Sequence, residues 1–167
     1  MNLSPLKVAV VGAGVMGRYH AMNYATMPRV DLVAVVDIDH FKRINDRYGH
    51  DVGDDALCHV ADVLRRMHRT GDLIVRQGGE EFVLMLPGMG SEEAYQRMEQ
   101  LRLNFIEHAF FSGEREVPLT VSIGLTWRAD GDWRVHQLMH RADAALYRAK
   151  KTGRNRVEMA DPQVAPV

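Results

Sequence analysis

The fold of this chain is decided by residues 31–39, which read Asp31-Leu32-Val33-Ala34-Val35-Val36-Asp37-Ile38-Asp39. The stretch is rich in β-branched residues and almost wholly apolar up to Ile38. An apolar run of this kind predicts a strand that is buried on both faces. Asp37 and Asp39 then stand at the end of that strand, and carboxylates from neighbouring strand ends can converge on a hard cation.

The hydrophobic spacing after this strand predicts alternating helices and strands. Residues 54–68 form the clearest amphipathic helix, with apolar residues at helical spacing. Two apolar stretches, 73–77 and 82–86, flank Gly78-Gly79 and predict a β-hairpin. The other predicted elements are a helix over 91–109 with Ser91 as N-cap, a half-buried strand over 119–127, a helix over 133–151 with Gly153 as C-cap, and an edge strand over 156–159.

Composition restricts the classes of protein. The chain has 167 residues, 46% hydrophobic and 26% charged, which suits one compact α/β domain. The formal net charge of −1 gives no reason to expect a nucleic acid or an anionic membrane as partner. The single cysteine, Cys58, excludes an intramolecular disulfide and is predicted to be a buried thiol. Without a signal peptide or a long apolar run, the chain is expected to be soluble and cytoplasmic.

Acidic residues recur at predicted strand ends and turns: Asp37 and Asp39, then Asp54, then Glu80 and Glu81 at the hairpin tip. Taken singly, each is ordinarily a solvated turn acid. As a set they predict a cation site, because Mg²⁺ prefers oxygen ligands and commonly takes one or two carboxylates plus substrate phosphates.

Several motifs in order resemble the GGDEF family of diguanylate cyclases over residues 37–159. The matching stretches are Asp37-Ile38-Asp39-His40-Phe41-Lys42-Arg43-Ile44-Asn45-Asp46, Tyr48-Gly49-His50, Gly53-Asp54, Gly78-Gly79-Glu80-Glu81-Phe82, residues 120–124, residues 142–150 and Gly153-Arg154-Asn155. The resemblance implies an α/β (α+β) fold with a mixed, mostly antiparallel central sheet flanked by helices. It predicts a GGDEF domain over residues 37–160, with its first strand beginning at about residue 31, and a tail at 161–167.

The resemblance also implies an activity, the condensation of two GTP molecules into cyclic di-GMP. Asp37, the Ile38 carbonyl and Glu80 would hold two Mg²⁺ ions, for which Mn²⁺ could substitute, and Glu81, an acidic residue on the same turn, would assist at the metal site. Each domain would hold one GTP. A homodimer would therefore be needed, and a monomer would be inactive.

Further residues are assigned to the substrate by the same resemblance. Asn45 and Asp54 would read the guanine edge, although a cap is the usual role of an asparagine such as Asn45. Lys150 and Arg154 lie four residues apart near a helix end, where they could share a face and contact phosphates or simply be solvated. The set is completed by the backbone amides of His40 and Phe41 and by Lys42.

A regulatory motif precedes the hairpin. Arg69-Thr70-Gly71-Asp72 is similar to the RxxD site at which many family members bind their product, cyclic di-GMP, as an inhibitor. The Arg69 guanidinium could stack on guanine while Asp72 binds its N–H edge, and Arg76 is assigned to the same patch. Outside this context, an R-x-x-D pair is ordinarily a surface ion pair.

The first 36 residues resemble a different family, the Gfo/Idh/MocA NAD(P)-dependent oxidoreductases. Gly12, Gly14 and Gly17 follow a predicted strand and open a predicted helix, and Asp37 lies 20 residues beyond Gly17. The resemblance ends after Asp39, so a nicotinamide would have only half a binding crevice. We therefore expect a Rossmann-like β-α segment in place of the usual N-terminal helix of the cyclase family, and no functional NAD(P) site.

This junction leaves alternatives to a working cyclase. Activity is expected to be weak and dependent on concentration, because the family's N-terminal helix motif is absent. The first alternative is a catalytically silent module that binds cyclic di-GMP or GTP. The second is an NAD(P)-binding oxidoreductase fragment within a natural or artificial chimera.

Overall fold

A five-stranded sheet in the order β2-β3-β1-β6-β7 forms the centre of the domain. The structure is a computed structural model that describes residues 32–128 and 135–160. Its strands are β1 (Leu32–Ile38), β2 (Leu73–Gly78), β3 (Glu81–Met85), β6 (Val121–Trp127) and β7 (Val157–Met159). All neighbours in the sheet are antiparallel except β6 and β7. The expected mixed, mostly antiparallel sheet is thereby confirmed, with β7 at its edge.

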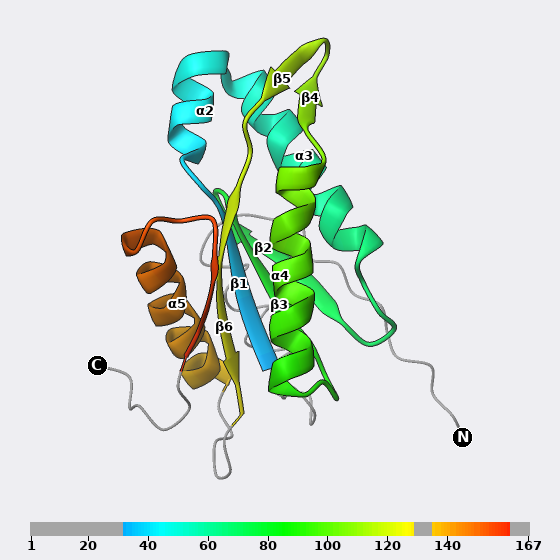
Figure 1. The fold of residues 1–167 in the computed structure, drawn as a ribbon, viewed down its shortest axis with the longest axis vertical. Coiled ribbons are helices and arrows are strands. Elements are labelled where there is room, and N and C mark those ends of the chain that lie inside the picture. Colours follow the sequence, from blue (N-terminus) through cyan, green and yellow to red (C-terminus); the bar gives the residue numbers. More distant parts are fainter. Residues whose placement is uncertain (1–31, 129–134, 161–167) are drawn as a thin grey trace.

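Helices cover both faces of this sheet. They are α2 (Phe41–Tyr48), α3 (His50–Arg66), α4 (Ser91–Glu107) and α5 (Val135–Lys151). In Figure 1, β1 and β6 lie between α5 on one side and α4 on the other. A small hairpin of β4 (Phe110–Ser112) and β5 (Arg115–Val117) extends beyond the sheet near α2 and α3. Among the described residues, none of the helices combines the length and apolar character that crossing a membrane requires.

Strand β1 is buried along its whole length, as its apolar run predicts. Leu32, Ala34, Val36 and Ile38 pack into the layer that contains α3 and α4. Val33 and Val35 pack on the opposite face with Leu138, Ala142 and Leu146 of α5. Because side chains alternate along a strand, Asp37 belongs to the same face as Val33 and Val35, the face covered by α5.

Strand β6 departs from its sequence-based prediction. Its alternation predicts a half-buried strand, yet residues 121–126 are all buried. The face expected to meet solvent carries Ser122, Gly124 and Thr126, and their small size allows α5 to approach closely. A Cβ on Gly124 would lie 2.1 Å from the Ala142 carbonyl oxygen and 2.4 Å from the Leu146 nitrogen. The alternation in β6 therefore separates a face of small residues from a face of large ones, and both faces are buried.

Two smaller predictions are wrong, and one element was missed. The N-cap of α4 is Gly90, and Ser91 is already the first helical residue. Cys58 is exposed, because it is turned about 100° away from the buried Leu57 on α3. The β4–β5 hairpin was not predicted, since each of its strands has only three residues.

The N-terminal assignments, including Gly12, Gly14 and Gly17, and the tail at 161–167 lie outside the described residues.

Candidate active site

The end of β1 meets the tip of the β2–β3 hairpin. The antiparallel register pairs Asp37 with Glu81, and the Ile38 amide donates a hydrogen bond to the Glu80 carbonyl at 3.3 Å. Gly79 adopts a left-handed φ of 53° at the tip, a conformation that glycine adopts without steric cost. The three predicted acids Asp37, Glu80 and Glu81 are therefore brought together.

Asp37 is the most deeply buried of these acids. Only 3% of the residue is exposed. Its Oδ2 atom forms an ion pair with Lys150 Nζ, on α5, at 2.7 Å. Burial raises the pKa of Asp37 from 3.8 to about 6. Lys150 opposes that rise, while the negative charges of Glu80 and Glu81 add to it. The site thus holds more negative charge than its single neighbouring lysine balances, which is the environment that a divalent cation stabilises.

Arg76 fixes the hairpin that carries Glu80 and Glu81. Its guanidinium donates from Nε and Nη2 to the Gly79 carbonyl, at 3.0 and 2.7 Å. The sequence prediction placed Arg76 with Arg69 and Asp72, but its observed hydrogen bonds lie at the other end of β2, beside the acids. Any role in product binding stays a prediction.

Asp39 has a structural role that the sequence did not indicate. Its carboxylate accepts hydrogen bonds from Thr120 Oγ1 at 2.8 Å, Ser122 Oγ at 2.6 Å and the Asn155 amide at 3.0 Å. These three donors come from the start of β6 and the loop after α5. Asp39 therefore ties the turn between β1 and α2 to both segments, and its oxygens are already engaged within the protein. The polar residues Thr120 and Ser122 were the available signal.

The helical hairpin of α2 and α3 positions the predicted base-reading residues. Asn45 lies on α2 with its side chain against Gly53 of α3, where a Cβ would stand 1.9 Å from Asn45 Oδ1 and 3.4 Å from the Phe41 ring. Asp54 follows Gly53 directly and is exposed. The absence of a side chain at Gly53 is thus what allows Asn45 of α2 to pack against α3 at the residue that precedes Asp54.

The predicted phosphate contacts occupy two different settings. His40 is the N-cap of α2 in a left-handed conformation with φ 57°, and Phe41 begins the helix. The first amides of a helix have no carbonyl of a preceding turn to bond. Lys42 is exposed on α2. Lys150 is in the last turn of α5, but Arg154 lies beyond the helix with φ 61°. Arg154 therefore does not share a helical face with Lys150, because α5 ends at Lys151.

The predicted inhibitory motif is engaged by α4. Arg69 Nη1 forms an ion pair with Glu93 Oε1 at 2.6 Å, and both side chains are about half exposed. Asp72 pairs with Arg97 Nη2 at 2.5 Å, and only 4% of the Asp72 side chain is exposed. Asp72 also accepts the Arg69 amide at 2.9 Å. Arg69 and Asp72 are close together as predicted, but both charges already have partners.

Comparison with known proteins shows which family the chain resembles. A family model described as the diguanylate cyclase GGDEF domain matches residues 20–156, leaving Gly12, Gly14 and Gly17 outside. The chain is 47% identical over 130 residues to diguanylate cyclase DgcP of Pseudomonas aeruginosa, covering 77% of this chain and 19% of that protein. It is 44% identical over 123 residues to diguanylate cyclase DgcM of Escherichia coli, covering 74% of this chain and 29% of that protein. The chain therefore spans well under half the length of these curated relatives.

Solved structures show the same fold. The active GGEEF domain of a diguanylate cyclase from Vibrio cholerae matches with a TM-score of 0.73 and 34% identity, over 87% of this chain and 90% of that one. The coiled coil and GGDEF domain of DgcB from Caulobacter crescentus, solved in complex with c-di-GMP, matches with a TM-score of 0.74 and 32% identity, over 87% of this chain and 75% of that one. With the motifs, the sheet order and the family match in agreement, this chain belongs to the GGDEF family of diguanylate cyclase domains.

Proposed function

We propose that this domain condenses two molecules of GTP into cyclic di-GMP, with release of two pyrophosphates. The observation that carries the proposal is the meeting of Asp37, at the end of β1, with Glu80 and Glu81 on the adjacent hairpin. The raised pKa of Asp37, about 6, supports it, because that carboxylate is held where its negative charge is poorly balanced.

The donor set fits a divalent cation, and we propose Mg²⁺, with Mn²⁺ as a substitute. Within the described part of the chain, no three His, Cys, Asp or Glu side chains converge to hold a metal ion. The ligands would then be Asp37, Glu80, the Ile38 carbonyl and the phosphates of the substrate, as Mg²⁺ sites commonly require. When bound, such ions would neutralise phosphate charge and lower the pKa of a coordinated hydroxyl.

The chain's own residues position the substrate. Asn45 and Asp54 supply hydrogen-bond acceptors and a donor for the guanine edge. Lys150, Arg154, Lys42 and the amides of His40 and Phe41 supply positive charge and donors for the triphosphate. In each of two successive steps, a 3′-oxygen forms a bond to an α-phosphorus and the bond from that phosphorus to pyrophosphate breaks. The attacking 3′-hydroxyl gives up its proton in each step, and the Glu81 carboxylate is the candidate acceptor of that proton.

A second copy of the domain is part of the proposal. Each site has one base-reading pair, Asn45 and Asp54, so each domain holds one GTP. Both bonds of the product form only when two such sites face each other. Specific activity should therefore rise with protein concentration, and a constant specific activity across a wide range would contradict this part of the proposal.

The direct test is incubation of the full chain with GTP and Mg²⁺ at high protein concentration, followed by chromatography of the nucleotides. We expect cyclic di-GMP from the parent protein and none from Glu80→Gln, which keeps the side-chain volume and removes the charge. Glu114→Gln, at an exposed position between β4 and β5, is the matched control and should retain activity.

The outcomes separate the candidate functions. Product that disappears only in Glu80→Gln supports the cyclase. Binding of cyclic di-GMP or GTP without turnover at any concentration would instead make the domain a silent binding module. Saturable NADH binding that is lost on Gly14→Val would favour the oxidoreductase fragment.

We also propose that Arg69 contacts cyclic di-GMP as a product inhibitor, through its exposed guanidinium. Asp72 and Arg76 were assigned to the same site from sequence. The burial of Asp72 against Arg97 supports a primarily structural role for this aspartate, and the bonds of Arg76 to Gly79 support a role in holding the hairpin.

A further inference from the structure

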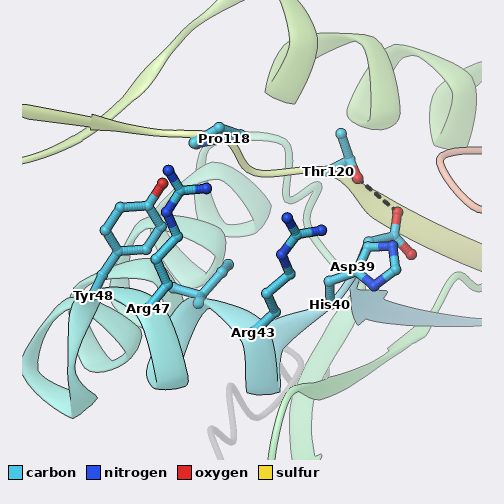
Figure 2. A pocket seen from close by; sticks show the side chains of 8 residues that line it. Asp39, His40, Arg43, Arg47, Tyr48, Pro118 and Thr120 are labelled. Atoms are coloured by element: carbon cyan, nitrogen blue, oxygen red, sulfur yellow. Dashed lines mark hydrogen bonds between the residues drawn. The ribbon is translucent and has the colours of Figure 1, made fainter.

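A pocket of about 270 Å³ lies between α2 and the segment that leads from β5 into β6. It is on the side of α2 that carries Arg43 and Arg47, whereas Asn45 is turned toward Gly53 of α3. Figure 2 shows the Arg43 and Arg47 side chains rising from α2 toward Pro118 and Thr120. The complete lining is Asp39, His40, Arg43, Ile44, Arg47, Tyr48, Pro118 and Thr120.

The positive charges in this pocket are not balanced within the protein. Arg43 and Arg47 are spaced i and i+4 on one short helix, a spacing at which like charges repel and destabilise the helix. A third guanidinium, that of Arg115, stands 5.9 Å from the centre of the Tyr48 ring. Across residues 32–128 and 135–160, no carboxylate forms a salt bridge with any of these three arginines.

The one carboxylate in the lining is already occupied. Asp39 accepts hydrogen bonds from Thr120, Ser122 and the Asn155 amide. In Figure 2 its carboxylate is directed at Thr120 and not at the guanidinium groups of Arg43 and Arg47. The positive groups of the pocket are therefore left for a ligand.

Tyr48 restricts the arginines that surround it. The guanidinium carbon of Arg47 lies 5.3 Å from the centre of the Tyr48 ring, within cation–π range. A guanidinium held on an aromatic ring loses less conformational freedom when it binds an anion. Its planar fork of N–H donors matches the oxygens of a phosphoryl group.

We infer that the pocket between α2 and residues 118–120 binds the phosphoryl group of a small anionic ligand, through Arg43 and Arg47. This site is additional to the proposed GTP site and does not depend on the cyclase assignment. The two sites share the turn between β1 and α2, because Asp39 and His40 line the pocket directly after Asp37 and Ile38. A ligand there would contact the same turn that carries the proposed catalytic carboxylate.

The test is calorimetric titration of the full chain, without divalent metal, using two probes. Pyrophosphate represents an inorganic source of the phosphoryl group, and AMP represents a nucleotide source that lacks the guanine edge. We expect saturable binding of at least one probe, weakened at least tenfold in the double variant Arg43→Met/Arg47→Met. The matched control is Arg65→Met/Arg66→Met, which removes the same charge from the end of α3 and should bind like the parent.

The variant Lys150→Met separates this pocket from the proposed GTP site. Binding that survives Lys150→Met but is lost in the Arg43/Arg47 variant supports the proposal, and the tighter probe identifies the source. Binding that is lost in Lys150→Met and kept in the Arg43/Arg47 variant would place the anion at the GTP site and overturn the proposal. The proposal would also be overturned if neither pyrophosphate nor AMP bound. Circular dichroism checks that each variant is folded, as expected for the exposed arginines and for Lys150, whose side chain is 31% exposed.

Discussion

Two buried aspartates in this domain are each paired with a cation from a later helix. Asp37 meets Lys150 of α5 at 2.7 Å, and Asp72 meets Arg97 of α4 at 2.5 Å. Arg97 is nearly buried, and its guanidinium also donates to the Met67 carbonyl, so this pair is closed on all sides. Lys150 is 31% exposed and its partner has Glu80 and Glu81 nearby, so this pair is open.

The difference between the pairs indicates different roles. A closed pair with extra hydrogen bonds fixes the turn between α3 and β2, and no ligand can reach it without opening the structure. In the open pair a cation can approach Asp37 and a phosphate can approach Lys150, so each charge can exchange its partner for a ligand. The same elements, a carboxylate and a cation, thus hold the fold in one place and, in the proposed function, would bind ligands in the other.

The largest expected effect comes from breaking the closed pair with Arg97→Met. Asp72 would remain buried without a cation, which typically costs about 3–5 kcal/mol of unfolding free energy. Urea unfolding followed by circular dichroism measures the loss. Arg65→Met is the matched control, because Arg65 forms an exposed pair with Asp62 at 3.1 Å that is worth less than about 1 kcal/mol. Equal, small losses in both variants would show that the Asp72 pair does not hold the fold.

The next effect concerns the pH dependence of the open pair in chelator-treated protein. Because burial raises the pKa of Asp37 from 3.8 to about 6, the folded state holds its proton more tightly than the unfolded state does. The resulting stability is fully present below the unfolded pKa and is lost as pH rises through the folded pKa. The loss should reach about 3 kcal/mol between about pH 4 and pH 7.

The variant Asp37→Asn isolates this contribution. It cannot ionise, so the difference in unfolding free energy between the variant and the parent should widen with rising pH over that window. Urea titrations at a series of pH values measure the difference. Parallel pH profiles would show that Asp37 titrates normally and that the open pair is as well balanced as the closed one.

The two regions also differ in how far the sequence predicted them. Residues 31–39 and the Gly78–Phe82 turn were sufficient to predict a central strand beside an acidic hairpin, because local patterns of apolar residues and glycine specify both. The partners of Asp72 could not be predicted from its motif. Glu93 and Arg97 are 24 and 25 residues away from Arg69 and Asp72 respectively, on a helix whose orientation depends on tertiary packing.

Packing also explains the predictions that failed. The alternation of β6 predicts a solvent-exposed face, because nothing in the strand itself reveals that α5 covers Gly124. Lys150 and Arg154 were placed on one helical face because their spacing allows it, whereas the chain leaves the helix at Lys151 and turns through left-handed residues. Asp39 was grouped with the metal-binding acids because its donors, Thr120 and Ser122, are more than 80 residues away.

Breaking the open pair from its cationic side should affect function more than stability. In Lys150→Met we expect a smaller stability loss than in Arg97→Met, because Lys150 is 31% exposed and Asp37, with its pKa raised to about 6, can take up a proton. Binding of GTP should weaken by about tenfold, because a charge-assisted contact to phosphate is lost. Equilibrium binding in the presence of Ca²⁺, in place of Mg²⁺ to slow turnover, measures the affinity. Lys151→Met is the matched control, since Lys151 lies over the Tyr147 ring and not against Asp37. Equal affinities for the two variants would remove Lys150 from the proposed site.

The smallest effect on stability is expected at the exposed neighbour of the closed pair. Glu93 holds Arg69 at 2.6 Å, so Glu93→Gln should change the unfolding free energy by less than about 1 kcal/mol. The same change removes the carboxylate that competes with cyclic di-GMP for the Arg69 guanidinium. Product binding, measured by calorimetry, should therefore tighten severalfold if Arg69 contacts the product as proposed.

The neighbouring Glu92→Gln provides the control for this last variant, because Glu92 accepts a hydrogen bond from Gln96 at 2.9 Å and does not touch Arg69. Both variants remove one negative charge from the first turn of α4, so a general electrostatic attraction of the anionic product would strengthen binding equally in the two. A gain confined to Glu93→Gln would show that Glu93 limits access to Arg69, while Asp72 stays with Arg97. Equal gains, or weaker binding in Glu93→Gln, would mean that the exposed pair does not restrict the product site.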